Sequence, residues 1–169
     1  KAAPADGKLA AMILLALCEV AALAVWFSTS AVVPQLRLEY ALSGFQLALL
    51  TSSVQAGFVL GTLASALLGL ADRIEPRRFF MVSALVAAAA TSLTLLLAPD
   101  SLAYIALRVL TGACMAGVYP VGMKIAATWP RGDMGLLIGT LTGALTLGSA
   151  VPHLLNVFGG TNWRLAIAV

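Results

Sequence analysis

Five long apolar segments, separated by short polar connections, constrain this chain more than any other feature of its sequence. A helix that rises about 1.5 Å per residue needs roughly 20 apolar residues to cross about 30 Å of hydrocarbon. Each segment reaches that length, and the short connections force neighbouring helices to run antiparallel. We therefore predict an all-α membrane protein, folded as a polytopic helical bundle. The predicted spans are residues 9–33, 45–70, 79–98, 102–128 and 134–158.

A further apolar run begins at Trp163, with a charged entry at Arg164. It has the character of a sixth span, yet the sequence ends at Val169, far below a spanning length. We therefore expect residues 1–169 to be a fragment of a longer protein.

The composition supports a membrane setting over a soluble one. Hydrophobic residues make up 61% and charged residues only 10% of the chain, against about 25% charged in soluble domains. The net charge of +3 does not indicate nucleic acid, because the basic residues form short clusters without interleaved aromatics. We expect a lipid bilayer as partner, no nucleic acid and no cofactor. Cys18 and Cys114 lie in apolar runs, where we expect small buried side chains, with no disulfide and no metal site.

Lysine and arginine are divided unevenly between the two sets of connections. Because cytoplasmic loops carry the excess of positive charge, the richer set predicts the cytoplasmic side, which includes the N-terminus. We expect an integral protein of a plasma membrane of the bacterial inner-membrane type. The richer set is Lys1, Lys8, Arg73, Arg77, Arg78, Lys124 and Arg131, and the poorer set is Arg37 and Arg164.

Small residues recur every four positions along two of the spans, which places them on one helix face and allows another backbone to approach closely. One interpretation is ordinary packing within the bundle. The other notes that both ladders fall on the middle helix of a three-helix unit, as in a three-plus-three inverted repeat, so that these faces would pack against a second half. The sequence leaves both open. The ladders are Gly57, Gly61, Ser65 and Gly69 in the second span, and Gly135, Gly139 and Gly143 in the fifth.

Two ionisable residues lie inside the predicted spans. Glu19 is roughly 15 Å deep in the first span and Arg108 roughly 10 Å deep in the fourth, counted from the opposite side. A charge at such depth costs several kcal/mol unless it faces water or a partner. Our hypothesis is that both share a cavity, in which Glu19 carries a proton and Arg108 either binds an anionic substrate or modulates the pKa of Glu19. The alternative is a buried ion pair that only fixes helix packing.

Weaker candidates for the substrate and proton pathway are Gln55, Tyr119 and His153. Histidine can serve in a proton relay, although at the end of a helix it is more often an interfacial hydrogen-bonding group. Lys124 lies about one turn from the cytoplasmic end and is expected to extend its ammonium group to the interface. Prolines 120 and 152 are expected to kink their helices, because proline removes a backbone hydrogen bond.

The loop that reads Gly69-Leu70-Ala71-Asp72-Arg73-Ile74-Glu75-Pro76-Arg77-Arg78 resembles the signature of the major facilitator superfamily between its second and third helices. Asp72, Arg73, Arg77 and Arg78 match in place, whereas Glu75-Pro76 replaces the usual Gly-Arg.

Three further motifs follow in register. Arg108-Val109-Leu110-Thr111-Gly112 is similar to the arginine-then-glycine motif of the family's fourth helix, and Trp163-Arg164 resembles its entry to helix six. The run from Gly139 to Gly148 resembles the fifth-helix glycine motif of antiporters, with Ala144 and Leu147 departing from it, so symport and antiport both stay open.

The resemblance implies an amino-terminal half whose carboxy-terminal half is absent. Helices one and four would line a central cavity, which is where Glu19 and Arg108 fall. Asp72 would contact a helix end in the absent half and, with Arg73, Arg77 and Arg78, form a cytoplasmic gating motif. Helices two and five would flank the boundary between halves. The packing or interface residues would then be Gly57, Gly61, Gly69, Gly112, Gly139, Gly143 and Gly148.

We therefore expect a secondary active transporter that moves a small solute by alternating access, coupled to protons, and not an enzyme. One alternative is a non-transporting membrane scaffold or an inactive truncated fragment. A remote alternative is an intramembrane hydrolase, because Ser149 and His153 lie one turn apart on a helix, but no acid stands near them on that helix to complete the site.

Overall fold

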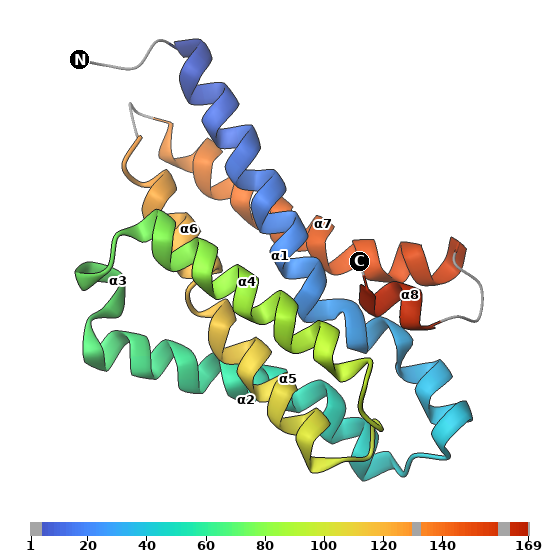
Figure 1. The fold of residues 1–169 in the computed structure, drawn as a ribbon. Coiled ribbons are helices and arrows are strands. Elements are labelled where there is room, and N and C mark those ends of the chain that lie inside the picture. The colour runs from blue at the N-terminus through green and yellow to red at the C-terminus, as the bar shows by residue number, and fades with distance from the viewer. Residues whose placement is uncertain (1–4, 130–132, 159–162, 169) are drawn as a thin grey trace.

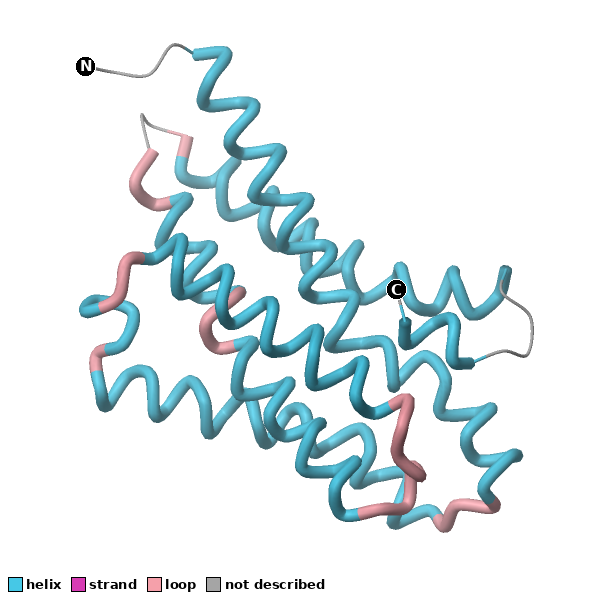
Figure 2. The backbone as a smooth tube through the Cα atoms, in the orientation of Figure 1, coloured by secondary structure: helices cyan, strands magenta, loops and turns pink. Residues whose placement is uncertain are grey.

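The structure, a computed structural model, describes residues 5–129, 133–158 and 163–168, and these residues form helices joined by short connections (Figures 1 and 2). Lys1, Arg131 and the predicted turn at 159–162 lie outside the described residues. The helices are α1 (Ala5–Tyr40), α2 (Gly44–Leu68), α3 (Leu70–Arg73), α4 (Pro76–Thr94), α5 (Leu102–Met115), α6 (Tyr119–Ala126), α7 (Met134–Phe158) and α8 (Trp163–Ala168).

Four helical stretches of the described chain are long and apolar enough to cross a membrane. The predicted third span is the exception, because α4 begins with Pro76-Arg77-Arg78 and ends at Thr94, before the predicted boundary at residue 98. The fold is nevertheless the predicted polytopic helical bundle of an integral membrane protein. The four stretches are Gly7–Tyr40, Gly44–Leu68, Leu102–Ala126 and Met134–Leu155.

The first helix is longer than predicted. We placed a connection from residue 34 to 44, but α1 passes through Pro34 and ends at Tyr40, and Figure 1 shows its last turns bending away from its first part. Pro34 removes only one hydrogen bond of the helix, which explains a bend rather than an end. The start of α2 is fixed by a capping box, in which the Ser43 side chain accepts from the Gln46 backbone and the Gln46 side chain from the Ser43 backbone.

The fourth span is broken rather than continuous over 102–128. The helix α5 ends at Met115, and α6 starts at Tyr119 after Val118 adopts φ −101° and ψ −80°. Pro120 has no N–H to donate to the carbonyl of Ala116, so the ladder cannot continue. The expected kink at Pro120 is therefore confirmed as a break in the α-helix at residues 116–118, which i→i+3 hydrogen bonds cross, whereas α7 passes through Pro152 as one helix.

Two helix pairs dominate the packing. The helix α2 lies along α5, α1 lies along α7, and α4 packs against α5. When the two three-helix units are exchanged, the first and fifth spans correspond to the fourth and second, so the two main pairs correspond to each other. This agrees with the three-plus-three repeat. Large apolar side chains such as Leu14, Leu17 and Leu67 are exposed on the outside of the bundle, as a lipid-facing surface requires.

Candidate functional site

Glu19 is completely buried on α1, and neither of its carboxylate oxygens has a hydrogen-bond partner among the described residues. Its Oε1 lies against Gly122 of α6, close enough that a side chain at that position would occupy the same volume. A buried carboxylate without a partner is costly. It is therefore the described acidic residue whose charge the fold compensates least.

Arg108 is also completely buried, on α5. Its Nη2 donates to the backbone carbonyl of Trp26 on α1 at 3.0 Å, while Nε and Nη1 have no partner in the described part of the chain. Tyr104 lies one turn away on the same helix, and its hydroxyl group is 3.4 Å from that of Thr29. The guanidinium thus keeps two donating nitrogens for another group within a polar, buried setting.

The structure does not bring Glu19 and Arg108 together. The ion pairs found among the described residues join other groups, so the alternative of a buried Glu19–Arg108 pair is not supported. Arg108 binds at the level of Trp26, seven residues beyond Glu19 on α1, which is about 10 Å along a helix axis. Glu19 lies against α6, whereas Arg108 of α5 bonds to α1 at a different level, and this geometry does not support the hypothesis of one shared cavity.

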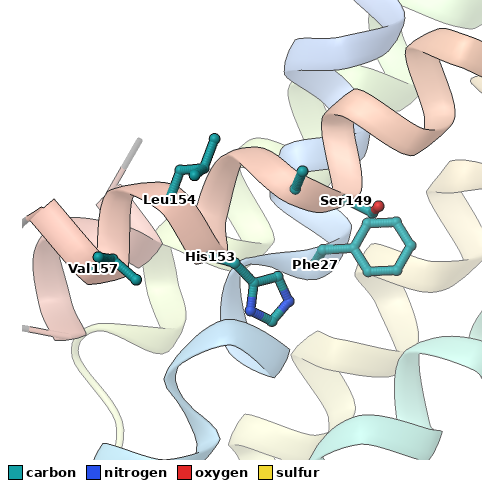
Figure 3. Close-up of a pocket in the computed structure, with 6 residues that line it drawn as sticks. Phe27, Ser149, His153, Leu154 and Val157 are labelled. Atoms are coloured by element: carbon teal, nitrogen blue, oxygen red, sulfur yellow. The ribbon is translucent and has the colours of Figure 1, made fainter.

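An open groove lies between α1 and the C-terminal half of α7 (Figure 3). Its lining is mostly apolar, from Phe27, Leu154 and Val157, with His153 and Ser149 as polar groups. In Figure 3 the imidazole ring of His153 projects from α7 toward the side on which Phe27 lies. The Ser149 hydroxyl donates to the carbonyl of Thr146 at 2.7 Å, so it is not bonded to His153 as a nucleophile would be to its base.

Gln55 and Tyr119 differ in their surroundings. Gln55 is exposed on α2, away from the buried face of that helix. Tyr119 is half-buried at the first position of α6, directly after the break in the fourth span. Tyr119 thus lies in the same broken segment as Gly122, whereas Gln55 shares no contact with Glu19 or Arg108 among those found.

Asp72 lies in the short helix α3 and accepts a hydrogen bond of 2.6 Å from Lys124 of α6. Lys124 also donates to the carbonyl of Ala71 at 2.6 Å. That Lys124 extends its ammonium group to the interface stays a prediction; its bonds to α3 form because the break in the fourth span leaves α6 beside α3. The hydrogen bond and the charge of Lys124 lower the pKa of the Asp72 carboxyl below its ordinary value.

The rest of the predicted gating motif is exposed. The side chains of Arg73, Arg77 and Arg78 all face outward. The departure of this loop from the family signature has a local explanation, because Glu75 caps α4 by accepting from the backbone N–H groups of Arg77 and Arg78 at 3.1 and 2.9 Å. Pro76 occupies the first turn, where its missing N–H costs nothing.

The glycines of α2 and α5 form a close seam. A Cβ at Gly57 would meet the backbone of Val109, one at Gly61 that of Ala113, and one at Gly112 that of Val54. The first ladder therefore packs within this chain, which favours the ordinary-packing interpretation for the second span. Gly69 plays another part, because its φ of 62° ends α2 in the left-handed conformation.

The glycines of α7 behave differently. No atom lies within 4 Å of a Cβ built at Gly135, Gly139 or Gly143, so the second ladder is bare in the described chain. Gly148, by contrast, packs against α1, with Leu23 Cβ 2.8 Å and the Val20 carbonyl oxygen 3.0 Å from its Cβ position. Of the seven glycines predicted to pack, three lie between α2 and α5, one lies between α1 and α7, one ends α2, and two lie on the open face of α7.

Sequence reasoning missed several residues that the structure makes important. Gly122 stands against Glu19, Trp26 supplies the carbonyl for Arg108, and Phe27 forms one wall of the groove. No pattern in the sequence marks these positions, since each acts through a contact with a distant helix. Cys18 and Cys114 are free cysteines; Cys18 is exposed, against the expectation that it is buried.

The chain matches the model of the Major Facilitator Superfamily over residues 15–169. The chain belongs to the Major Facilitator Superfamily. No curated protein and no solved structure matches it at the significance required. The superfamily is a family of membrane transporters, and the apolar helices of this chain fit that class. Within a major facilitator protein, Glu19, Arg108 and the groove beside α7 form the candidate functional region.

Proposed function

We propose that this chain is part of a secondary active transporter that moves a small solute by alternating access and couples that movement to protons. The observation that carries the proposal is the pair of buried ionisable groups on α1 and α5, both with unpartnered polar atoms. Such groups inside a membrane are costly, and they characteristically mark substrate and ion pathways. The absence of an ion pair between them leaves each free for a separate role.

In this proposal Glu19 carries the proton. Its carboxyl group is buried between α1 and α6 and has no cation within salt-bridge distance among the described residues. A proton would neutralise the carboxylate, and its release would restore a charge that the surrounding helices do not compensate. Protonation therefore changes the energy of this arrangement, which is what coupling to a conformational change requires.

Arg108 supplies the binding group for an anionic part of the solute. One nitrogen already donates to the carbonyl of Trp26, and the other two can donate to a carboxylate or phosphate. The apolar groove beside Phe27 and His153 suits the remaining part of the solute. A small organic anion with an apolar portion is the substrate class that these groups favour.

The N-terminus is proposed to be cytoplasmic, and the path is proposed to be completed by a carboxy-terminal half that faces α1 and α5. The bare glycine face of α7 supports such a partner, because close helix contact needs small residues. The alternatives of a scaffold or an inactive fragment predict no solute flux from the intact protein.

The test is flux in proteoliposomes that contain the intact protein, with a pH-sensitive dye inside and a panel of organic anions, sugars and cationic drugs outside. We expect Glu19→Gln to abolish solute-driven proton movement. Asp100→Asn, which alters an exposed acid in the turn before α5, is the matched control and should leave proton movement unchanged. Unaltered coupling in Glu19→Gln would refute the proton role.

The arginine is tested separately. Arg108→Lys keeps the charge but loses the planar fork, so we expect anion flux to fall about tenfold, which corresponds to about 1.4 kcal/mol. Arg37→Lys changes an exposed arginine at the end of α1 and should have no effect. Equal flux in both variants would show that Arg108 does not contact the solute.

A further inference from the structure

Gly122 differs from the glycines of the α2–α5 seam in what it contacts. A Cβ at Gly57, Gly61 or Gly112 would meet backbone atoms, which cannot move without separating two helices. At Gly122 the three nearest atoms all belong to the Glu19 side chain, with the Cδ of that residue 3.0 Å and Cγ 3.6 Å from the Cβ position. Only the end of a flexible side chain stands in the way. A methyl group at residue 122 would therefore displace a carboxyl group and leave the helices in place.

The position of Gly122 in the chain adds a second observation. It is the fourth residue of α6, the helix that starts after the break at residues 116–118. The first turn of any helix has N–H groups without intrahelical partners and carries the positive end of the helix dipole, which favours a carboxylate. The Glu19 carboxyl group, fully buried and without a hydrogen-bond partner, lies against this turn. Interrupted helices in transporters bind ions or anionic groups in this way.

Three charged groups on the neighbouring helices engage partners other than Glu19. On α6, Lys124 bonds to Asp72 and the carbonyl of Ala71. On α5, Arg108 bonds to Trp26. At the start of α7, Asp133 pairs with Lys8 of α1. The exposed Arg77 and Arg78 lie at the start of α4, and His153 lines the groove by Phe27. Cys114 and Tyr119 lie on either side of the break. None of these groups bonds to Glu19.

We propose that Gly122 is a positioning residue, which leaves room for the Glu19 carboxyl group against the first turn of α6 and so creates the proton-binding site of this chain. This inference rests on the proposed proton coupling and identifies where and how the proton is held. The proton adds to a carboxylate oxygen to give a neutral acid and leaves from that oxygen again. A proton suits a single carboxylate, whereas the described residues hold no group of three metal-binding side chains.

The geometry gives a sharp pair of variants. Gly122→Ala places a methyl group where the Glu19 carboxyl group lies. Combined with Glu19→Asp, which shortens the acid by one methylene, the same change should leave room for the carboxyl group again. Gly44→Ala is the matched control, because no atom lies within 4 Å of that Cβ position at the start of α2.

The first readout needs no substrate. A hydrophobic carbodiimide reacts with protonated carboxyl groups inside membranes, and mass spectrometry of the intact protein would locate the adduct at Glu19. We expect Gly122→Ala to slow this labelling about tenfold, a barrier change of about 1.4 kcal/mol. The combination of Gly122→Ala with Glu19→Asp should restore labelling of the shortened acid. Size-exclusion profiles identify the variants that remain folded.

Labelling unchanged in Gly122→Ala, or slowed equally in Gly44→Ala, would overturn the positioning role. Protection of Glu19 by Na⁺ at constant pH would overturn the assignment of a proton. The proton role of Glu19 and the positioning role of Gly122 can be refuted separately. If Glu19→Gln abolishes coupling but Gly122→Ala changes neither labelling nor coupling, the function stands and this inference falls. If Glu19→Gln leaves coupling intact, the proposed proton role falls whatever Gly122 does.

Discussion

The helix pairs α2–α5 and α1–α7 correspond to each other in the predicted repeat, but their glycines make different contacts. Between α2 and α5, Gly57, Gly61 and Gly112 bring one backbone against the other. Between α1 and α7 only Gly148 is in close contact, and the three earlier glycines of α7 face open space. The same spacing of small residues thus belongs to a closed seam in one pair and to an open face in the other.

The difference shows that a four-residue spacing determines a helix face but not its occupant. On α2 the small face is turned toward α5, so the helices approach until backbone meets backbone. On α7 the small face is turned away from α1, and larger residues such as Leu137 and Leu141 fill the buried side. Substitutions at the closed seam should therefore destabilise the protein more than substitutions on the open face.

Gly112→Ala should have the largest effect. Its Cβ would collide with the Val54 carbonyl group and lie 2.9 Å from the Phe58 nitrogen, so α2 and α5 must separate. Overpacking of this kind costs about 1–3 kcal/mol, and more where backbone must move. Thermal unfolding of the intact protein in detergent would measure the loss against Gly44→Ala. A melting temperature equal to that of the control would mean that the seam is looser than described.

Gly148→Ala should have an intermediate effect, of about 1 kcal/mol. Its neighbours on α1 are a Cβ atom of Leu23 and the carbonyl oxygen of Val20, at 2.8 and 3.0 Å. A shift of a few tenths of an ångström between α1 and α7 relieves both contacts. The same unfolding assay should rank this variant between the control and Gly112→Ala, and a loss larger than that of Gly112→Ala would reverse the comparison.

The two lysine–aspartate pairs join different helices and differ in exposure. Lys8–Asp133 joins α1 to α7 and is partly buried, whereas Lys124–Asp72 joins α6 to α3 and is more exposed. The pKa of Asp72 is lowered in the folded state. The ionised carboxylate therefore stabilises the fold above the pKa of the unfolded chain, about 4, and this stabilisation is lost as the pH falls through the lower pKa of the folded state. Asp72→Asn should remove this part of the pH dependence and destabilise less than Gly148→Ala.

Unfolding measured from pH 7 downward would check this prediction, with Asp100→Asn as the exposed control. Because exposed ion pairs are screened by salt, the difference between Asp72→Asn and the parent should shrink in high salt. An acid-induced loss of stability identical in the two proteins would contradict the assigned role of Asp72.

Gly139→Ala should have the smallest effect. Its Cβ meets nothing within 4 Å, and alanine is favoured over glycine inside a helix by about 1 kcal/mol. We expect unchanged or slightly raised stability. A loss as large as that of Gly112→Ala would show that another part of the protein covers this face as tightly as α5 covers α2.

Features that depend on local chemistry and on segment length could be predicted from the amino-acid sequence alone. Apolar runs of spanning length predicted the bundle, Pro120 predicted the defect in the fourth span, and the motifs around Asp72 and Arg108 predicted the superfamily. The sequence also singled out Glu19 and Arg108, because a charge among apolar residues is visible without any neighbour. The predicted helix ends were less accurate in two places. Helix α1 continues past Pro34, and α4 ends at Thr94, before the end of its apolar run.

Contacts between residues far apart in the chain could not be predicted in this way and came from the packed helices. In the structure Glu19 and Arg108 are apart, Lys124 pairs with Asp72, and Gly122 lies against the Glu19 carboxyl group. One glycine ladder is closed, and the other is open. These outcomes depend on the rotation and depth of each helix relative to its neighbours, which are set by side-chain packing across helices. A periodic sequence shows which residues share a helix face, but which helix contacts that face is known only from the packed structure.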